Sequence, residues 1–273
     1  MATAKIMPSW VTEVKVVGIH RRMTGLPTGA SHASCARLQF GSHNQRGMTP
    51  SLVTLIAVRC AVTQGYRNRV ENSTECIAAI RTGDVDSLNR ILERNPVLVQ
   101  SKVDGQRTLL HVATDWPGHF PNVRASVSVL VSRGADVNAA FVGHHSERPL
   151  HWAASSDDVD ALDALLDHGA DIEAPGGVIG GGTPLADAVA FRQWRAARRL
   201  VERGARTVLW QAAALGLNRR VEECFTRNPP PPPEEITNAF WCACHGGQLP
   251  AFPTLPYQCG ACRRVKMGSR KTL

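Results

Sequence analysis

A Gly-Ala dipeptide recurs three times in the middle of the chain, each time just after an apolar run with helical character. The three copies are Gly134-Ala135, Gly169-Ala170 and Gly204-Ala205. Self-similarity at a period of roughly thirty residues is typical of a solenoid built from stacked repeats. One helix pair cannot bury its apolar face alone, so such repeats are stable only as neighbours in a stack.

A second motif recurs where each helix pair is expected to begin: Thr108-Leu109-Leu110-His111, Arg148-Pro149-Leu150-His151 and Thr183-Pro184-Leu185-Ala186. Repeat starts are then predicted near Thr74, Thr108, Arg148, Thr183, Thr207 and Thr237, at spacings of 34, 40, 35, 24 and 30 residues. The longest spacing leaves room for an insertion at residues 116–121, and the shortest has lost most of a hairpin loop.

These motifs resemble the ankyrin repeat, whose period is about 33 residues and whose pattern is Thr-Pro-Leu-His-x-Ala. The resemblance covers about two thirds of the chain. It implies an all-α ankyrin-repeat solenoid of helix-turn-helix repeats with short β-hairpin loops. The composition on either side of it predicts flanking disordered tails. We expect about five and a half repeats over residues 72–249, a disordered basic tail or targeting segment over 1–71, and an irregular basic tail over 250–273.

Individual residues fit this scheme. The Thr183 hydroxyl is expected to cap a helix, and Pro184 suits the first helical position, where no N–H is needed. Gly134, like the two equivalent glycines, suits the left-handed residue after a helix. In the family, the histidine of the pattern bonds to the neighbouring turn, which implies a structural role for His111 and His151. Three tryptophans are expected in the core: Trp152, Trp210 and Trp241.

Charge is unevenly spread along the sequence. Residues 1–70 carry a net charge of +8, residues 71–249 carry −5, and residues 250–273 carry +5. The first segment is rich in Ser, Arg and Gly and fits a transit peptide, a disordered tail or a misassigned start. We expect a cytoplasmic protein, with organelle targeting through residues 1–70 as the alternative. The apolar run 51–58 is too short to span a membrane, and no motif predicts specific nucleic-acid binding.

The C-terminal part departs from the repeat pattern. Residues 237–247 look like the first helix and turn of a sixth repeat, but Pro250, Pro253 and Pro256 exclude a second helix. We therefore expect the array to stop half-way through a repeat, through truncation or a shifted reading frame. The proline run 229–233 is interpreted as a stiff spacer, with a proline-rich ligand for an adaptor domain as the alternative.

The candidate chemistry is sparse, and we expect neither an enzyme nor a bound cofactor. No catalytic motif is present, and the loop 176–182 is rich in glycine but matches no phosphate-binding pattern. The Cys and His residues at the C-terminal end suggest zinc as an alternative, with weak candidate ligands Cys244, His245, Cys259 and Cys262. Cys242 and Cys244 lie two apart on a helix and so point to different faces. A Cys259/Cys262 redox pair lacks the usual strand–helix context.

The resemblance implies binding of a protein partner, unidentified by sequence, through hairpin tips and the inner-helix surface. The residues after each Ala-Ala pair are expected to project there, and Trp116 and Phe191 are the best anchors. The hairpins 141–147 and 175–182 are the expected tips. Candidate contact residues are Arg81, Asp115, Trp116, Ser155, Ser156, Phe191, Leu215, His144 and His145. Four arginines, Arg195, Arg198, Arg199 and Arg203, form a cationic helix face: a solvated surface, or a site for an acidic partner. We expect a monomer.

Overall fold

The structure, a computed structural model, describes residues 71–248. The described chain is a succession of helix pairs. Residues 71–82 form a helix that pairs with α3 (Val85–Arg94), which a short 3-10 helix, η1 (Pro96–Val99), follows. The next helices are α4 (Leu109–Thr114), α5 (Val123–Ser132), α6 (Pro149–Ser155), α7 (Val159–Asp167), α8 (Pro184–Ala190), α9 (Trp194–Glu202), α10 (Leu209–Leu215), α11 (Asn218–Phe225) and α12 (Pro233–His245).

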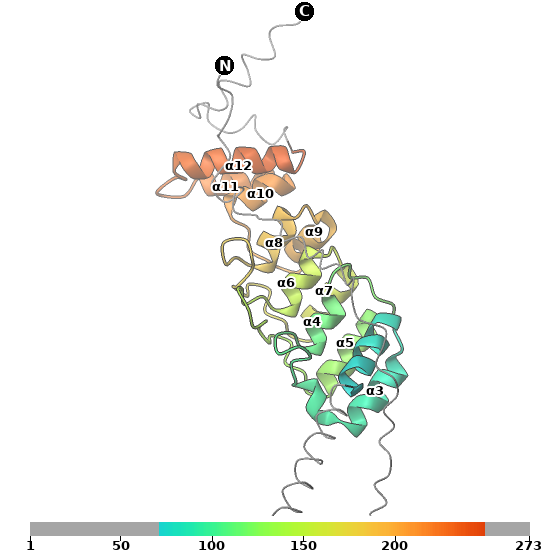
Figure 1. The fold of residues 1–273 in the computed structure, drawn as a ribbon. Helices are drawn as coiled ribbons and strands as arrows, with labels where there is room; N and C mark the ends of the chain where they lie inside the picture. The colour runs from blue at the N-terminus through green and yellow to red at the C-terminus, as the bar shows by residue number, and fades with distance from the viewer. Residues whose placement is uncertain (1–70, 249–273) are drawn as a thin grey trace, which may run out of the picture. The chain divides into compact units, whose positions relative to one another are not determined.

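The helices stack in two rows (Figure 1). The inner row is α4, α6, α8, α10 and α12, each packed on the next, and the outer row is α3, α5, α7 and α9. No strand occurs within residues 71–248, and the hairpin loops are turns closed by one or two backbone hydrogen bonds. The predicted all-helical repeat fold is therefore confirmed.

The helix boundaries follow from the residues expected to set them. Pro149 and Pro184 occupy first helical positions, and Gly134 adopts a φ of 96° after α5, a conformation that costs glycine little. The Thr108 hydroxyl accepts the N–H of His111 at 3.4 Å. The expected hydroxyl cap by Thr183 is wrong, because its backbone carbonyl rather than its side chain accepts the N–H of Ala186, at 2.8 Å.

Two buried histidines join successive repeats, as predicted. Nε2 of His111 lies 3.2 Å from the carbonyl oxygen of Glu147, and Nε2 of His151 lies 3.2 Å from that of Gly182. Nδ1 of each ring accepts a backbone N–H of its own repeat, so the proton sits on Nε2 and the ring is neutral. Burial lowers the pKa of His111 to about 4 and lowers that of His151 as well.

Small residues let the inner helices approach closely. Ala153 and Ala154 are fully buried, as are Leu110 and Leu185 in the neighbouring repeats, and all belong to one apolar cluster. A second, smaller cluster joins α10, α11 and α12 through residues such as Leu209, Val221 and Ala243. The apolar core therefore follows the stack from repeat to repeat, as expected for a solenoid.

The last described helix differs from its prediction in two respects. Helix α12 begins at Pro233 rather than near Thr237, because the final proline of the run 229–233 occupies a first helical position, where its missing N–H costs nothing. The prediction that Trp241 is in the core is wrong: its side chain is 44 % exposed, since no described helix covers that face of α12. Trp152 and Trp210 are half-buried, consistent with their prediction. Residues 250–273, with the predicted end of the array, lie outside the described residues.

Candidate partner-binding surface

The C-terminal ends of the inner helices place several predicted contact residues in the same register. Asp115 follows α4, Ser155 and Ser156 end α6, and Phe191 follows α8. We call the surface made by these inter-helix turns, including Trp116, the turn edge. Because the inner helices stack directly on one another, the structure brings these residues onto one side of the array.

Hydrogen bonds between repeats hold the turn edge rigid. The Gln193 side chain donates to the carbonyl of Ser155 at 3.0 Å, and the Ala196 N–H donates to the Asp157 carboxylate at 2.8 Å. The fully buried Asp158 accepts the N–H of His119 at 2.6 Å, which fixes the insertion at residues 116–121. Each bond crosses from one repeat to the next, so the turns form one continuous support.

The most exposed aromatic side chain among residues 71–248 is Trp116, at 80 %. The preceding Asp115 accepts from Arg107 at 2.7 Å, and Arg107 also binds Asp104 at 2.6 Å, so the turn beneath Trp116 is fixed. Burial raises the pKa of Asp115. Phe191 is exposed as well, at 38 %. Both predicted anchors are thus available to solvent on a rigid support, which is what an anchor for a partner requires.

The remaining residues predicted on this side behave differently. Arg81 is exposed on the first helix, and Ser155 and Ser156 are half-buried. The prediction that Leu215 projects from the surface is wrong, since it is only 3 % exposed. Helix α12 lies against this end of α10, and Gly246 lies so close to Ala214 that a side chain on it would meet the backbone there. Leu215 therefore belongs to the core.

The hairpin 141–147 lies at the other end of the inner helices, because α6 starts directly after it and runs away from it to Ser155. Seven residues of helix separate the two sites by about 10 Å. His144 is exposed at the tip. His145 instead turns inward, with its ring stacked 4.6 Å from that of Phe141 and Nδ1 3.1 Å from Glu147 Oε2. The structure therefore does not bring the hairpin histidines to Trp116.

A buried pair of acidic side chains underlies both hairpins, and the sequence did not reveal it. Glu147 and Asp187 are 5 % and 0 % exposed. Glu147 accepts the Trp152 indole N–H at 2.8 Å and the Val178 N–H at 3.2 Å. Burial and the negative charge of Glu147 raise the pKa of Asp187 to about 9, so Asp187 is protonated at neutral pH. One feature of the sequence could have indicated the pair: α8 has an acid, Asp187, at the helix position where α6 has Trp152.

The acid pair holds the glycine-rich loop 176–182 in place. The Ile179 N–H donates to Asp187 Oδ1 at 3.3 Å, beside the bond from Val178 to Glu147. Gly177 must be glycine, since a Cβ there would lie 2.7 Å from Asp187 Oδ2. Two hydrogen bonds of 3.0 Å, from the N–H groups of Gly176 and Gly177, close the loop. The hydrogen bonds of the pair to Val178 and Ile179 position the second hairpin tip.

The alternative metal site has little support in the described residues. Cys244 and His245 are exposed on α12, and Cys242 is buried on another face, as their spacing predicted. Within residues 71–248, no cluster of three or more His, Cys, Asp or Glu side chains could hold a metal ion. Cys259 and Cys262 lie outside the described residues. Burial raises the pKa of the Cys242 thiol to about 12, which makes it a poor ligand or nucleophile.

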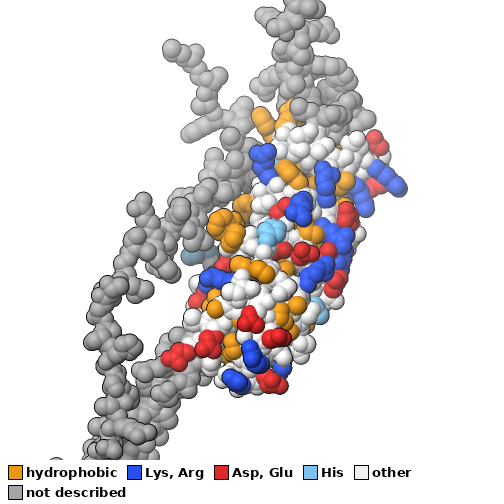
Figure 2. Space-filling view, turned by 90° about the vertical axis from the view of Figure 1, so that its right-hand side faces the viewer, with side chains coloured by type: hydrophobic (Ala, Val, Ile, Leu, Met, Phe, Trp, Pro, Cys, Tyr) orange, Lys and Arg blue, Asp and Glu red, His pale blue; other side chains and the backbone are white. Residues whose placement is uncertain are grey.

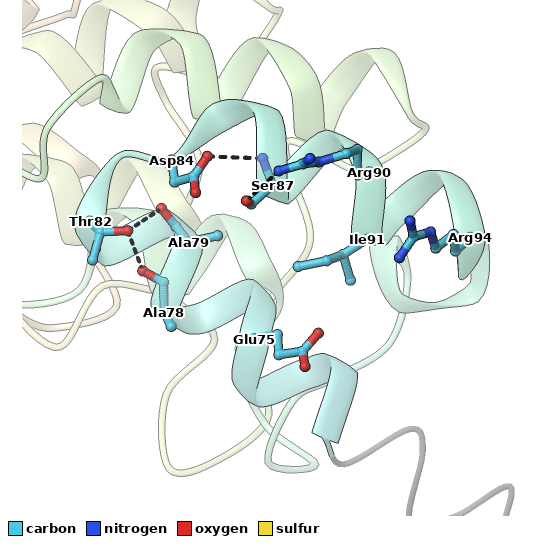
Figure 3. Close-up of a pocket in the computed structure, with 9 residues that line it drawn as sticks. All are labelled: Glu75, Ala78, Ala79, Thr82, Asp84, Ser87, Arg90, Ile91 and Arg94. Carbon is cyan, nitrogen blue, oxygen red and sulfur yellow. Dashed lines mark hydrogen bonds between the residues drawn. The ribbon is translucent and has the colours of Figure 1, made fainter.

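A hollow of about 400 Å³ lies between the first helix and α3 (Figure 3). Its polar lining is largely engaged with itself: Asp84 accepts the Ser87 N–H at 2.9 Å, and Arg90 donates to the Ser87 hydroxyl at 2.9 Å. Thr82 donates to the carbonyl of Ala78 at 2.9 Å. The lining carries side chains of both charge signs that bond to one another, so the hollow shows no preference for a charged ligand.

The fold and the exposed turn edge define a helical repeat protein. Among the described helices, none is long and apolar enough to cross a membrane. The family model for ankyrin repeats, in three copies, matches residues 75–176. Residues 75–176 therefore consist of ankyrin repeats, as the sequence motifs indicated. The comparison with curated proteins gave no match.

Proposed function

We propose that the chain is a non-catalytic ankyrin-repeat scaffold that binds another protein through its inner-helix surface, turn edge and hairpin tips. The proposed array covers residues 72–249, with basic tails on either side. The observation that carries this proposal is Trp116, which is 80 % exposed on a turn fixed by Arg107 and Asp158. Large exposed aromatic side chains on rigid supports are the usual anchors of protein interfaces.

The proposed contact residues form two groups. On the turn edge these are Asp115, Trp116, Ser155, Ser156 and Phe191, with Arg81 on the preceding helix, and at the hairpin tip they are His144 and His145. Ser155 and Ser156 lie between the two aromatic anchors, because α6 stacks between α4 and α8. A partner that contacts both anchors therefore also crosses these polar residues. One partner long enough to cross the inner helices can touch both groups.

An affinity capture experiment tests this surface. Wild-type chain and the variant Trp116→Ala/Phe191→Ala are compared for the proteins that each retains from the source cells. We expect the variant to lose the main partner, because removing a central aromatic anchor costs about 2 kcal/mol or more of binding free energy. The control is Val97→Ala/Val208→Ala, which removes exposed apolar side chains elsewhere on the array. Equal capture by wild type and the Trp116/Phe191 variant refutes the proposed surface.

We further propose that the chain works as a cytoplasmic monomer. Fusion of residues 1–70 to a fluorescent reporter distinguishes this location from the alternative of organelle targeting. A diffuse reporter supports the cytoplasm, and an organelle pattern overturns it. Light scattering after size-exclusion chromatography measures the mass: a single species of about 29.6 kDa is the expected result.

A further inference from the structure

The formal charge of the array changes sign along the sequence. Residues 71–190 hold 8 basic and 17 acidic side chains, a net charge of −9, whereas residues 191–227 hold 9 basic and 3 acidic ones, a net charge of +6. Figure 2 shows Lys and Arg side chains gathered on the upper part of the visible face, at the level of α9 to α11 in Figure 1. The fourth repeat and its neighbour therefore carry a cationic region that the overall charge of the array conceals.

The arginines of α9 fall into two sets. Arg199 and Arg203 lean toward α7, where both bind Asp163, with nitrogen–oxygen distances of 2.9 and 2.7 Å. Arg195 and Arg198 are exposed and make no ion pair or hydrogen bond with any side chain of residues 71–248. The first set is neutralised within the fold, and the second is available to a partner.

Arg192 extends the second set to the turn edge. It is exposed in the turn that joins α8 to α9, directly after Phe191, and it also makes no ion pair within the described residues. We call Arg192, Arg195 and Arg198 the arginine surface. Because this surface adjoins Phe191, a bound segment can place an apolar side chain on the ring and carboxylates on the guanidinium groups.

We propose that the arginine surface binds an extended acidic segment of a partner protein. This inference rests on the proposed function, since it names the chemistry of the partner beside Phe191. Side chains three apart on a helix have Cβ atoms about 5–6 Å apart, and alternate side chains of an extended chain repeat about every 6.6 Å. Arg195 and Arg198 therefore match carboxylates at positions i and i+2 of such a segment, and guanidinium groups bind carboxylates with paired hydrogen bonds.

A short acidic segment fits this surface better than a long polyanion. The adjoining residues 71–190 carry a net charge of −9, which repels any nucleic acid that extends beyond the arginine surface. The chain also lacks a recognised nucleic-acid motif. A segment of a few acidic residues remains within reach of the arginines and avoids this repulsion.

Fluorescence anisotropy tests the proposal with the full chain. The probe is a fluorescein-labelled peptide in which Glu alternates with Gly around one central Leu, and the blank probe carries Gln in place of Glu. We expect Arg195→Glu/Arg198→Glu to weaken binding of the acidic probe about tenfold, because two attractive pairs become repulsive. The matched control, Arg90→Glu/Arg94→Glu on α3, makes the same change of net charge on exposed outer-helix arginines and should bind as wild type does.

Several outcomes would overturn the proposal. Equal weakening by both variants means that the peptide responds to overall charge, including that of the basic tails. If an oligothymidine binds more tightly than the acidic peptide and Arg195→Glu/Arg198→Glu weakens that binding, the surface binds nucleic acid instead. If the wild-type chain has the mass of a dimer and Arg195→Glu/Arg198→Glu restores the mass of a monomer, the surface binds a second copy of the chain. Circular dichroism checks that the variants fold, and Arg195→Gln/Arg198→Gln replaces any that does not. If the Trp116→Ala/Phe191→Ala variant loses its partner while the acidic probe never binds, the arginine inference fails and the proposed function stands.

Discussion

Nε2 of His111 donates to the backbone carbonyl of Glu147 at 3.2 Å, while the side chain of Glu147 reaches onward to Trp152 and Val178. One residue thus connects three successive repeats: its backbone receives a bond from the repeat before it, and its carboxylate accepts from its own repeat and from the next loop. The stability of such an array is the sum of the stabilities of its repeats and of the interfaces between them. Protonation of side chains at these interfaces should therefore change the free energy of unfolding of the whole array.

The first prediction concerns the stability of the array in mild acid. Burial lowers the pKa of His111 to about 4, below its ordinary value of 6.5, so the unfolded chain binds a proton that the folded chain excludes. The free energy of unfolding should therefore fall as the pH drops from 6.5 to about 4, by up to about 3 kcal/mol for this group. Urea unfolding across this range measures the loss. A His111→Gln variant should show a shallower dependence, and an unchanged slope would contradict the assignment.

The second prediction concerns Asp187. Its pKa is raised to about 9, so the folded state holds a proton that the unfolded chain releases above pH 4, and this carboxyl reduces stability increasingly as the pH rises toward 9. Asp187→Asn keeps a donor toward Glu147 without the ionisable proton. We expect the variant to be more stable than wild type by about 1–2 kcal/mol at pH 8, with the difference shrinking toward pH 4.

Thermal unfolding at the two pH values measures this difference. The matched control is Asp171→Asn, an exposed aspartate in a neighbouring turn, which should change stability by less than about 0.5 kcal/mol. An Asp187→Asn variant that is less stable than wild type at pH 8 would show that the carboxyl is not the protonated partner of Glu147.

Local signals in the sequence were sufficient for most of the fold but not for the acid pair. Pro149 and Gly134 each act within one helix end or one turn, so their roles could be predicted from their immediate neighbours. The bond from His111 to Glu147 crosses to the next repeat, and it was predicted only because the family pattern implies it. The contact between Glu147 and Asp187 joins positions 40 residues apart and exists only when two hairpins fold together. Leu215 and Trp241 were misplaced because their burial also depends on distant packing. Helix α12 covers Leu215 at the end of α10, whereas no described helix covers the face of α12 that carries Trp241.

The third prediction concerns the ion pairs between outer helices. Asp163 is 5 % exposed and accepts from Arg199 and Arg203, which hold its pKa below the ordinary value despite burial. Asp163→Ala leaves two guanidinium groups without this partner, so we expect a loss of about 1–3 kcal/mol in the free energy of unfolding. Asp167→Ala removes a 55 % exposed carboxylate of α7 that also binds Arg203, and should cost less than about 1 kcal/mol.

Urea unfolding at neutral pH compares the two variants. Since the pKa of Asp163 is lowered on folding, its contribution is present above pH 4 and is lost as the pH falls below that value. Similar losses in both variants would mean that the buried position of Asp163 has no energetic consequence.

The fourth prediction tests the packing of the last described helix. Gly246 has a φ of −80°, which alanine adopts without strain, but its Cβ would meet the backbone of Ala214 in α10. Gly246→Ala should therefore displace the end of α12 and cost about 1–3 kcal/mol through crowding alone. Gly247→Ala is the matched neighbour: a Cβ there meets nothing within 4 Å, but its φ of 71° imposes about 1 kcal/mol of backbone strain.

Hydrogen exchange separates these two causes. Crowding at Gly246 should lower the protection of amides throughout the C-terminal half of α12 and of the facing residues 212–215 of α10, because the two helices part. Strain at Gly247 should affect only the amides next to the substitution, since α12 stays in place. Protection that falls equally in both variants would show that α12 is not held against α10 by the close approach at Gly246, and that the burial of Leu215 has another cause.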